Sequence, residues 1–209
     1  MPAVDFWYEF ASTYSYPAAM RVEALALQRG VSLRWRPFLL GPIFAAQGMA
    51  DSPFNLHAAK GRYMWSDLQR ICAGLGLPLR RPDPFPQNSL LAARVALALD
   101  DARRPEFSRA VYAAEFGAGA AIAERATIAA ILVSMARDVD EILARAASAP
   151  VKEKLRSETA RAESLGIFGA PNLVTADGEV FWGNDRLEEG LDWALAKSRS
   201  GAQSGNRRG

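Results

Sequence analysis

The hydrophobic and polar positions near the start of the chain fall into three successive patterns. Residues 4–10 are apolar almost throughout, which is typical of a strand buried on both faces of a sheet. Residues 17–30 carry a helical pattern, with proline near the first turn and glycine at the end. Residues 31–38 then alternate between apolar and polar side chains, as a half-buried strand does. The three segments predict a β-α-β unit.

The middle of the chain is predominantly helical. Residues 41–59 carry Gly, Pro and Asp at irregular spacing and predict a long loop with broken helix. Asn88 stands where the N-cap of a later helix is expected. The glycines of "FGAGAA" predict a turn between helices, because they lack the spacing of a nucleotide-binding loop. We expect the helices at residues 60–77, 88–102, 105–116, 124–136, 138–147 and 150–165.

The end of the chain returns to strand patterns. Asn172–Thr175 and Val180–Trp182 predict two strands, and Asp177-Gly178 between them predicts a type I′ hairpin turn. Asp185, followed three residues later by Glu188, predicts a capping box that opens a last helix, running to about Lys197.

This order of elements is β-α-β, a block of helices, then β-β-α. It predicts an α/β protein with a thioredoxin-like fold and a large all-helical insertion. We expect residues 1–45 and 166–198 to form the thioredoxin-like domain, and residues 46–165 to form the helical insertion domain. Residues 199–209 carry no large apolar side chain, so they predict a disordered tail.

Composition and charge exclude several classes of protein. Half of the 209 residues are hydrophobic, and a net charge of +2 is too small to indicate nucleic acid as a partner. No stretch is long and apolar enough to span a membrane. The single cysteine, Cys72, excludes internal disulfides and a Cys-based zinc site, and we expect no metal. Asp5 and Glu9 stand where a signal peptide needs positive charge and then an apolar core, so we expect a cytoplasmic protein.

Four segments resemble the 2-hydroxychromene-2-carboxylate isomerase family, a relative of the kappa-class glutathione transferases and of the DsbA disulfide oxidoreductases. The opening "DFWYEFASTYSYPAA" is similar to the family's "DFxxDFxSPYSYLA", and "KGRYMWSDLQR" to its Lys-Gly-x-Tyr-x-x-x-Asp-Leu segment. "FPQNSLLAAR" resembles its Phe-Pro-x-Asn stretch, and "GIFGAPNLVTADGEVFWGNDRLE" resembles its Gly-x-Phe-Gly-x-Pro to Gly-x-Asp-Arg signature. Each segment is weak alone, but their order and spacing are specific.

The resemblance implies a role for Ser12, which stands where a thioredoxin carries its first reactive cysteine. In the family this serine holds the thiolate of bound glutathione, so the sulfur arrives with the cofactor. A helix N-terminus and one hydroxyl donor both favour an anion there, which lowers the pKa of the thiol. From the residues alone, Ser12 can also be read as an N-cap. We expect Ser15, at the second cysteine position, to be a helix or packing residue.

The resemblance also implies that Pro171 is cis and lies opposite Ser12, although a loop proline is ordinarily trans. That geometry would free the backbone of Ala170 to pair with the cysteinyl residue of glutathione, as an added strand does. Asn184 and Asp185 would take the γ-glutamyl end, with Asp185 binding its ammonium group; alternatively, both simply cap the last helix.

Lys60 is either a solvated charge or, as the resemblance implies, a cation for the glycyl carboxylate or the substrate carboxylate. Asn88 is the second candidate for binding substrate. The family often has asparagine where this chain has Asp51, and a carboxylate there would repel an anionic ligand. We expect His57 and Cys72 to be structural. Four aromatic residues line a pocket or belong to the core, and for each alone we expect the core: Trp7, Phe44, Trp65 and Trp182.

These observations favour a glutathione-dependent isomerase, a homodimer, that interconverts 2-hydroxychromene-2-carboxylate and trans-o-hydroxybenzylidenepyruvate or a related ring-opened aromatic carboxylate. The expected cofactor is glutathione. A kappa-like glutathione transferase or peroxidase would share the thiolate site but consume glutathione. A non-catalytic binding protein would share only the scaffold. Ser12 and Ser15 exclude a disulfide oxidoreductase, because disulfide exchange needs a thiolate on the protein.

Overall fold

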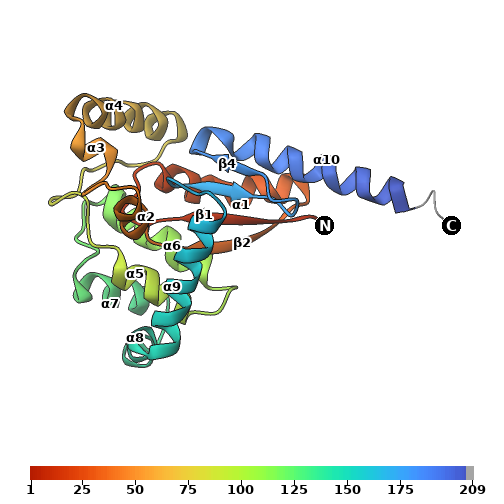
Figure 1. Ribbon diagram of the computed structural model, residues 1–209. Helices are drawn as coiled ribbons and strands as arrows, with labels where there is room; N and C mark the ends of the chain where they lie inside the picture. The colour runs from red at the N-terminus through yellow and green to blue at the C-terminus, as the bar shows by residue number, and fades with distance from the viewer. Residues whose placement is uncertain (206–209) are drawn as a thin grey trace.

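The computed structural model describes the backbone of residues 1–205 and the side chains of residues 1–200 (Figure 1). Four strands form one sheet in the order β2-β1-β3-β4. Strands β1 and β2 are parallel, whereas β1–β3 and β3–β4 are antiparallel. The predicted thioredoxin-like arrangement is confirmed. The strands are β1 (Ala3–Tyr8), β2 (Ser32–Pro37), β3 (Asn172–Val174) and β4 (Val180–Trp182).

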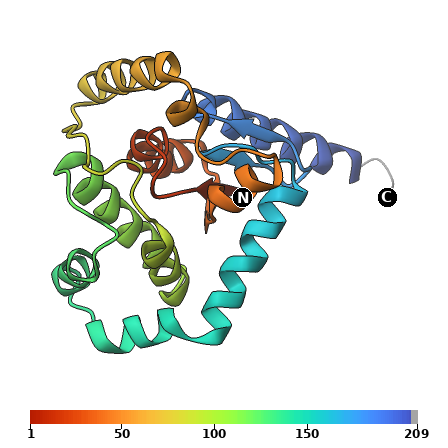
Figure 2. The same cartoon turned by 60° about the vertical axis from the view of Figure 1, so that its left-hand side comes forward.

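Helices surround this sheet and form most of the chain between its two halves. Helix α1 (Ser15–Arg29) joins β1 to β2, and α10 (Leu187–Gly205) follows the 3-10 helix η2 (Asn184–Arg186). Helices α4 to α9 form an arc beside the sheet (Figure 2). The intervening helices are α2 (Leu40–Ala46), α3 (Pro53–Leu56), α4 (Ala58–Leu75), α5 (Leu90–Ala98), α6 (Arg104–Tyr112), the π-helix η1 (Ala113–Gly117), α7 (Arg125–Ser134), α8 (Val139–Ala147) and α9 (Ala149–Ser164).

Strand β1 is apolar except for Asp5, because both of its faces are buried. Phe6 and Tyr8 point into the larger hydrophobic core, together with residues of α1, α5, α6 and α10. Trp7 points the other way into a smaller core, where its ring packs edge-on against Phe38 at 6.0 Å between centroids. The two-sided burial follows from the alternation of side chains along a strand.

One charged residue of β1 is also buried and holds the last inserted helix against the sheet. Asp5 is 3% exposed, and its carboxylate accepts from Arg34 at 2.5 Å and from Arg36 at 3.4 Å, both on β2. Arg161 of α9 reaches the same carboxylate at 3.5 Å. Because a buried carboxylate is costly unless it is paired, these contacts fix where α9 crosses the sheet.

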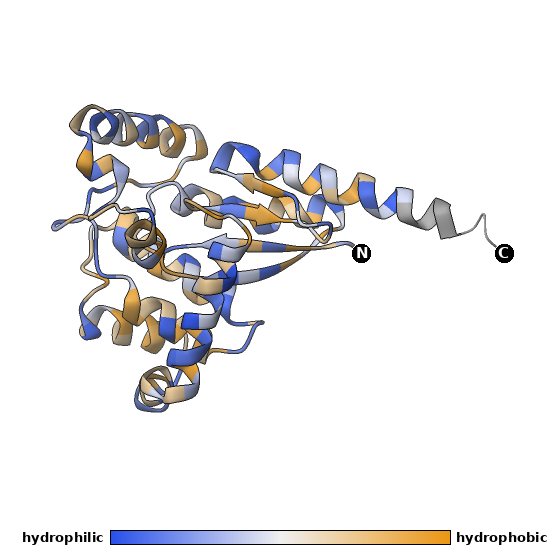
Figure 3. Cartoon of the chain, in the orientation of Figure 1, coloured by the Kyte–Doolittle hydropathy of each residue, from blue (hydrophilic) through white to orange (hydrophobic). Residues whose placement is uncertain are grey.

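The larger core continues from the sheet into the inserted helices. It contains residues of β1, β2 and α1 and also residues of α5 to α9, and Figure 3 shows apolar residues gathered on the strands and on α5. Arg104, at 4% exposure, strengthens this connection. Its guanidinium donates to the carbonyl oxygens of Ala96 (2.8 Å) and Leu99 (3.4 Å) at the end of α5, and of Trp35 (3.1 Å) in β2. One hydrophobic core therefore spans both the predicted thioredoxin-like part, residues 1–45 and 166–198, and the predicted insertion, residues 46–165.

The β3–β4 hairpin differs from the predicted type I′ turn. That turn needs positive φ at two residues, but within the hairpin only Gly178 has one, at 88°. The amide of Gly178 donates to the Thr175 carbonyl at 3.0 Å, and the amide of Thr175 donates to the Glu179 carbonyl at 3.0 Å. The connection is thus one residue longer than predicted. Asp177 instead accepts from the Thr175 hydroxyl at 2.5 Å and from the Trp193 indole at 3.1 Å.

The last helix corrects two further predictions. Asp185 does not stand at a helix N-cap: it lies inside the 3-10 helix η2, whose own N-cap position is Gly183 and whose first amides bond no capping side chain. Helix α10 extends to Gly205, so residues 199–205 are helical where a disordered tail was expected. Residues 206–209 of that tail lie outside the described residues.

Candidate functional site

A cavity of about 850 Å³ opens between the thioredoxin-like elements and the inserted helices. Its wall includes the turn between β1 and α1, helix α2, the loop leading to α4, the link before α5 and the loop before β3. Four of the residues expected at the site line it: Ser12, Lys60, Asn88 and Ala170. Residues far apart in the sequence therefore meet at one hollow.

Ser12 lies half-buried in the turn between β1 and α1. Its hydroxyl donates to the carbonyl oxygen of Ala170 at 3.0 Å. Helix α1 begins at Ser15 with Tyr14 at the N-cap position, and no side chain caps its amides. The interpretation of Ser12 as a helix cap is therefore wrong, and its hydroxyl is directed at the loop before β3. Ser15 is fully buried and does not line the cavity, in agreement with a packing role.

The loop before β3 presents a cis bond to Ser12. The Ala170–Pro171 peptide bond is cis, as the resemblance implies. Gly169, which precedes it, has no room for a side chain, because a Cβ atom would lie 2.7 Å from Nε1 of Trp182. The indole of Trp182 thus covers the backbone immediately before the cis bond.

Lys60 and Asn88 belong to the inserted segment of the chain, and both are exposed. Lys60 belongs to the first turn of α4. Asn88 precedes Ser89, which occupies the N-cap position of α5, but the side-chain oxygen of Asn88 accepts from the Leu90 amide at 3.0 Å. Asn88, the predicted N-cap, therefore bonds the start of α5 from one residue before the observed N-cap position and also lines the cavity.

Asn184 and Asp185 do not line the cavity. They lie beside the cis-proline loop, because the amide of Gly183 donates to the carbonyl oxygen of Pro171 at 2.9 Å. Asn184 is 7% exposed, and its Oδ1 has no hydrogen-bond partner among the described residues. The side chain of Asp185 is exposed and lies 4.0 Å from Arg186. Their expected role toward a ligand stays a prediction.

Asp51 lines the cavity, but the surrounding loop binds its carboxylate. Its Oδ1 accepts from the Ser52 amide at 2.6 Å. Both carboxylate oxygens accept from Nδ2 of Asn55, Oδ2 at 3.1 Å and Oδ1 at 3.2 Å. The carboxylate thus stabilises the start of α3, which gives it a local role that the sequence alone did not indicate.

Glu9 is a cavity residue that the sequence analysis did not assign to the site. It follows β1, lines the cavity and is only 5% exposed. The hydroxyl of Ser89 donates to its carboxylate. Burial raises the pKa of Glu9 to about 7, although the Ser89 hydroxyl and the backbone amides of Ala11 and Ser12 oppose that rise. The available signal was its place as one of two carboxylates, with Asp5, in an otherwise apolar run.

A second buried carboxyl lies behind Glu9. Glu115 belongs to η1 and is fully buried, and neither of its oxygens has a hydrogen-bond partner among the described residues. Burial raises the pKa of Glu115 well above its usual value, and the charge of Glu9 raises it further. Tyr112, from the preceding helix, donates its hydroxyl to the backbone carbonyl of Glu9 at 2.9 Å.

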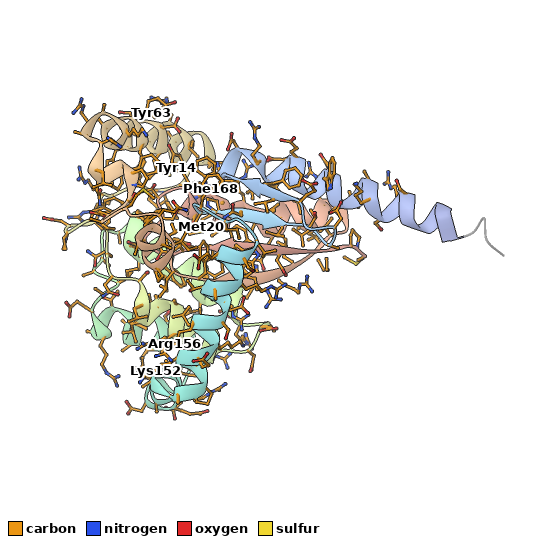
Figure 4. All side chains as sticks on the ribbon, in the orientation of Figure 1. Tyr14, Met20, Tyr63, Lys152, Arg156 and Phe168 are labelled. Atoms are coloured by element: carbon orange, nitrogen blue, oxygen red, sulfur yellow. The ribbon has the colours of Figure 1, made fainter. Side chains whose placement is uncertain are left out.

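Aromatic residues form part of the cavity wall. Phe44 and Trp182 both line it, so the expectation that each belongs to the core is wrong. The ring of Phe168 packs edge-on against Trp182 at 4.7 Å between centroids, and both are partly exposed. Tyr14 lines the same cavity, and its hydroxyl donates to Asp67 at 3.0 Å. Figure 4 labels Tyr14 and Phe168 on the loops that precede α1 and β3.

Four other residues considered in the sequence analysis do not line the cavity. Trp7 is buried in the smaller core, and Trp65 packs against Phe85 at 4.9 Å between centroids without lining the cavity. Cys72 is buried in α4, and burial raises the pKa of its thiol to about 11. His57 is exposed at the junction of α3 and α4.

None of the helices in residues 1–205 is both long and apolar enough to cross a membrane. Within the same part of the chain, no group of three or more His, Cys, Asp or Glu side chains is placed to hold a metal ion.

The sheet order, the β-α-β and β-β-α halves and the cis proline facing the first turn define a thioredoxin-fold protein. The DSBA-like thioredoxin domain family matches residues 3–192, and the chain belongs to that family.

Similar proteins carry enzyme names. A 2-hydroxychromene-2-carboxylate isomerase from Sphingobium xenophagum is 28% identical over 186 residues, which cover 88% of this chain and 94% of that protein. Glutathione S-transferase kappa 2 from Caenorhabditis elegans is 26% identical over 91% of this chain and 90% of its own length. A solved structure of a 2-hydroxychromene-2-carboxylate isomerase superposes with a TM-score of 0.83 at 26% identity, covering 98% of both chains.

Proposed function

We propose that the protein is a glutathione-dependent isomerase that interconverts 2-hydroxychromene-2-carboxylate and trans-o-hydroxybenzylidenepyruvate, or a related ring-opened aromatic carboxylate. The observation that carries the proposal is the Ser12 hydroxyl, directed at a cis-proline loop inside a large cavity. The relatives named 2-hydroxychromene-2-carboxylate isomerase support the isomerase activity, and those named glutathione transferase support glutathione as the cofactor.

The residues present fit glutathione better than a thiol of the protein itself. The only cysteine, Cys72, is buried and outside the cavity, so any thiol at Ser12 must come from a ligand. A volume of about 850 Å³ lies in the upper part of the range of ligand pockets, roughly 300–1,000 Å³. The cavity therefore has room for a tripeptide together with a small aromatic carboxylate.

Ser12 and Ala170 would exchange partners when the ligand binds. In the structure, the Ser12 hydroxyl donates to the Ala170 carbonyl at 3.0 Å. Turning that hydroxyl toward a thiolate leaves the carbonyl of Ala170 free to accept from the backbone of a bound peptide, as in strand addition. A charge-assisted bond to sulfur then replaces a neutral one, which favours the ionised form of the ligand.

The two ends of glutathione would be held by different parts of the chain. Asn184 and Asp185 lie next to Pro171, beyond the cavity wall, where Asp185 can bind the ammonium group of the γ-glutamyl end. Oδ1 of Asn184, which has no hydrogen-bond partner within the described part of the chain, is a second acceptor at this position. Lys60 and Asn88 line the cavity from the inserted helices and would bind the glycyl carboxylate or the carboxylate of the substrate.

When bound, glutathione would supply a thiolate nucleophile for reversible addition to the conjugated chain of the substrate, which would allow rotation about a former double bond. The protein's own residues hold the reacting groups together and stabilise negative charge, which are proximity and electrostatic contributions. Ser12 contributes one positioned donor. Phe44, Phe168 and Trp182 provide apolar walls for an aromatic ring.

A kappa-like glutathione transferase is the second candidate, because relatives of that name match about nine-tenths of the chain. Calorimetric titration with glutathione, followed by an isomerisation assay on 2-hydroxychromene-2-carboxylate, separates the alternatives. We expect binding, interconversion only when glutathione is present, and no loss of total thiol during turnover. Loss of thiol would favour the transferase, and absence of binding would favour a non-catalytic protein. Sedimentation of the same sample tests the predicted homodimer.

A further inference from the structure

Glu9 is the ionisable group with the most unusual surroundings in the cavity. It lines the same hollow as Ser12 and lies three residues before it, yet only 5% of its surface is exposed. A carboxylate in such a position is ordinarily neutralised by a cation, but no ion pair of Glu9 occurs among the described residues. Its only side-chain partner is the hydroxyl of Ser89. The group is therefore positioned by a neutral donor and not by a salt bridge.

We propose that Glu9 is the proton acceptor for a thiol ligand in the cavity. Its carboxylate accepts the S–H proton that the thiol loses on binding, and returns that proton when the ligand leaves. The S–H bond of the thiol breaks as an O–H bond forms at the Glu9 carboxylate, so no other reactant is needed. The inference rests on the proposed function, since glutathione is the thiol concerned.

Ser12 cannot perform this task itself. Its hydroxyl is used as a donor, and an alcohol is a poor proton acceptor near neutral pH. Glu9 is suited to it, because burial brings its pKa to about 7, where a group both accepts and donates protons efficiently.

The other ionisable groups around Glu9 support the same role. On the core side lie Tyr112, which bonds the backbone of Glu9, and Glu115, whose pKa is raised by burial and by the charge of Glu9. An ionised Glu9 therefore keeps Glu115 protonated, and the pair holds one negative charge at most near neutral pH. On the open side, Asp51, Lys60 and Tyr14 line the cavity. Asp51 is already bound by its own loop.

Proton release during glutathione binding tests the proposal without turnover. Calorimetry at pH 8 in buffers of different ionisation enthalpy counts the protons released per ligand. We expect wild-type protein to release almost none at this pH, because the negative charge of the bound thiolate raises the pKa of Glu9 further and keeps its carboxyl protonated. Glu9→Gln should release close to one proton, because that proton must go to the buffer. S-methylglutathione, which has no thiol proton, should give the same value in both proteins. Glu153→Gln, an exposed carboxylate of α9, should behave as wild type.

Two further measurements keep the outcome decisive if Glu9→Gln folds poorly. In the wild type alone, the infrared band of a protonated carboxyl should grow when glutathione is added at pH 8, and not with S-methylglutathione. Ser89→Ala removes a bond that lowers the pKa of Glu9, so its proton uptake should persist to higher pH. Glutathione binding without the infrared change, or with equal proton release from wild type and Glu9→Gln, overturns the role of Glu9 alone. A wild type that binds no glutathione overturns the proposed function as well.

Discussion

At the scale of single residues, buried carboxyls are the least ordinary feature of this molecule. Most buried acids in proteins are paired with a cation or bonded by several donors. Glu9 has the Ser89 hydroxyl and nearby amides, and Glu115 has no bonding partner in the described residues. Burial favours the neutral form of such groups, so they make the stability of the fold depend on pH.

Glu9→Gln should therefore change the pH dependence of unfolding. The native pKa of about 7 lies above the ordinary value of 4.5, so the native state binds the proton more tightly than the unfolded chain does. The contribution is fully present below pH 4.5 and is lost as pH rises toward 7, by on the order of 3 kcal/mol. Urea unfolding at pH 5 and pH 8 should show the wild type losing this amount relative to the variant. Parallel pH profiles would contradict the raised pKa.

Asp185→Ala tests the ligand role of a residue that contributes little to the fold. The side chain is exposed and does not cap α10, so the midpoint of thermal unfolding should not change. Loss of a charged partner for the ammonium group should weaken glutathione binding about tenfold, or 1.4 kcal/mol. Glu189→Ala is the matched control, because Glu189 is exposed and also lies near Arg186. Equal affinities in the two variants would remove Asp185 from the site.

Some of the candidate site residues could be predicted from short sequence motifs, and others could not. Ser12, Lys60, Asn88 and Ala170 belong to short motifs, and the structure brings all four to one cavity. Glu9 could not be assigned in this way, because its burial depends on Ser89, 80 residues away, and on elements of the helical insertion. Partners at that separation are set by packing and leave no periodic signal in the sequence.

At the scale of elements, Arg104 fixes the end of α5. Its guanidinium bonds the carbonyls of Ala96 and Leu99, which the helix itself leaves free, and also bonds Trp35 in β2. A planar group with several fixed donors suits three separate acceptors, and a single ammonium does not. The same contact ties the inserted helices to the sheet, so its loss affects more than one helix end.

Arg104→Lys should lower the free energy of unfolding by about 3 kcal/mol, because buried carbonyls lose donors that lysine cannot replace. Arg103→Lys is the control at the neighbouring position, where the side chain is exposed and pairs with Glu106. Chemical denaturation measures both. A difference of less than about 1 kcal/mol between the two variants would show that Arg104 is not a structural tie.

The order and type of most elements followed from hydrophobic periodicity. Strand β1 was recognisable from its almost continuous apolar run, and the two halves of the sheet from the strand patterns on either side of the block of helices. Three local predictions failed for reasons beyond the local sequence. Asp177 bonds Thr175 and Trp193, α10 begins at Leu187 after the 3-10 helix η2, and α10 continues past Lys197. In each case local turn and capping rules competed with tertiary contacts or with helix propagation.

At the scale of the whole molecule, one core supports a site built from two parts of the chain. The thioredoxin-like half provides Ser12 and the cis-proline loop, and the inserted helices provide Lys60, Asn88 and Ser89. Because the larger core runs through both parts, a change in the insertion can alter the geometry at Ser12. The inserted segment therefore forms part of the cavity wall and also part of the larger core.

The central claim is that the cavity holds glutathione as a thiolate against Ser12. The direct measurement is the pKa of bound glutathione, followed by ultraviolet thiolate absorbance in wild type, Ser12→Ala and the buried control Ser15→Ala. We predict a lowered thiol pKa in wild type and Ser15→Ala, and a higher value in Ser12→Ala. Loss of one positioned donor, about 2.7–4 kcal/mol, should also lower turnover by roughly two orders of magnitude. An unchanged pKa and full activity in Ser12→Ala would contradict the account.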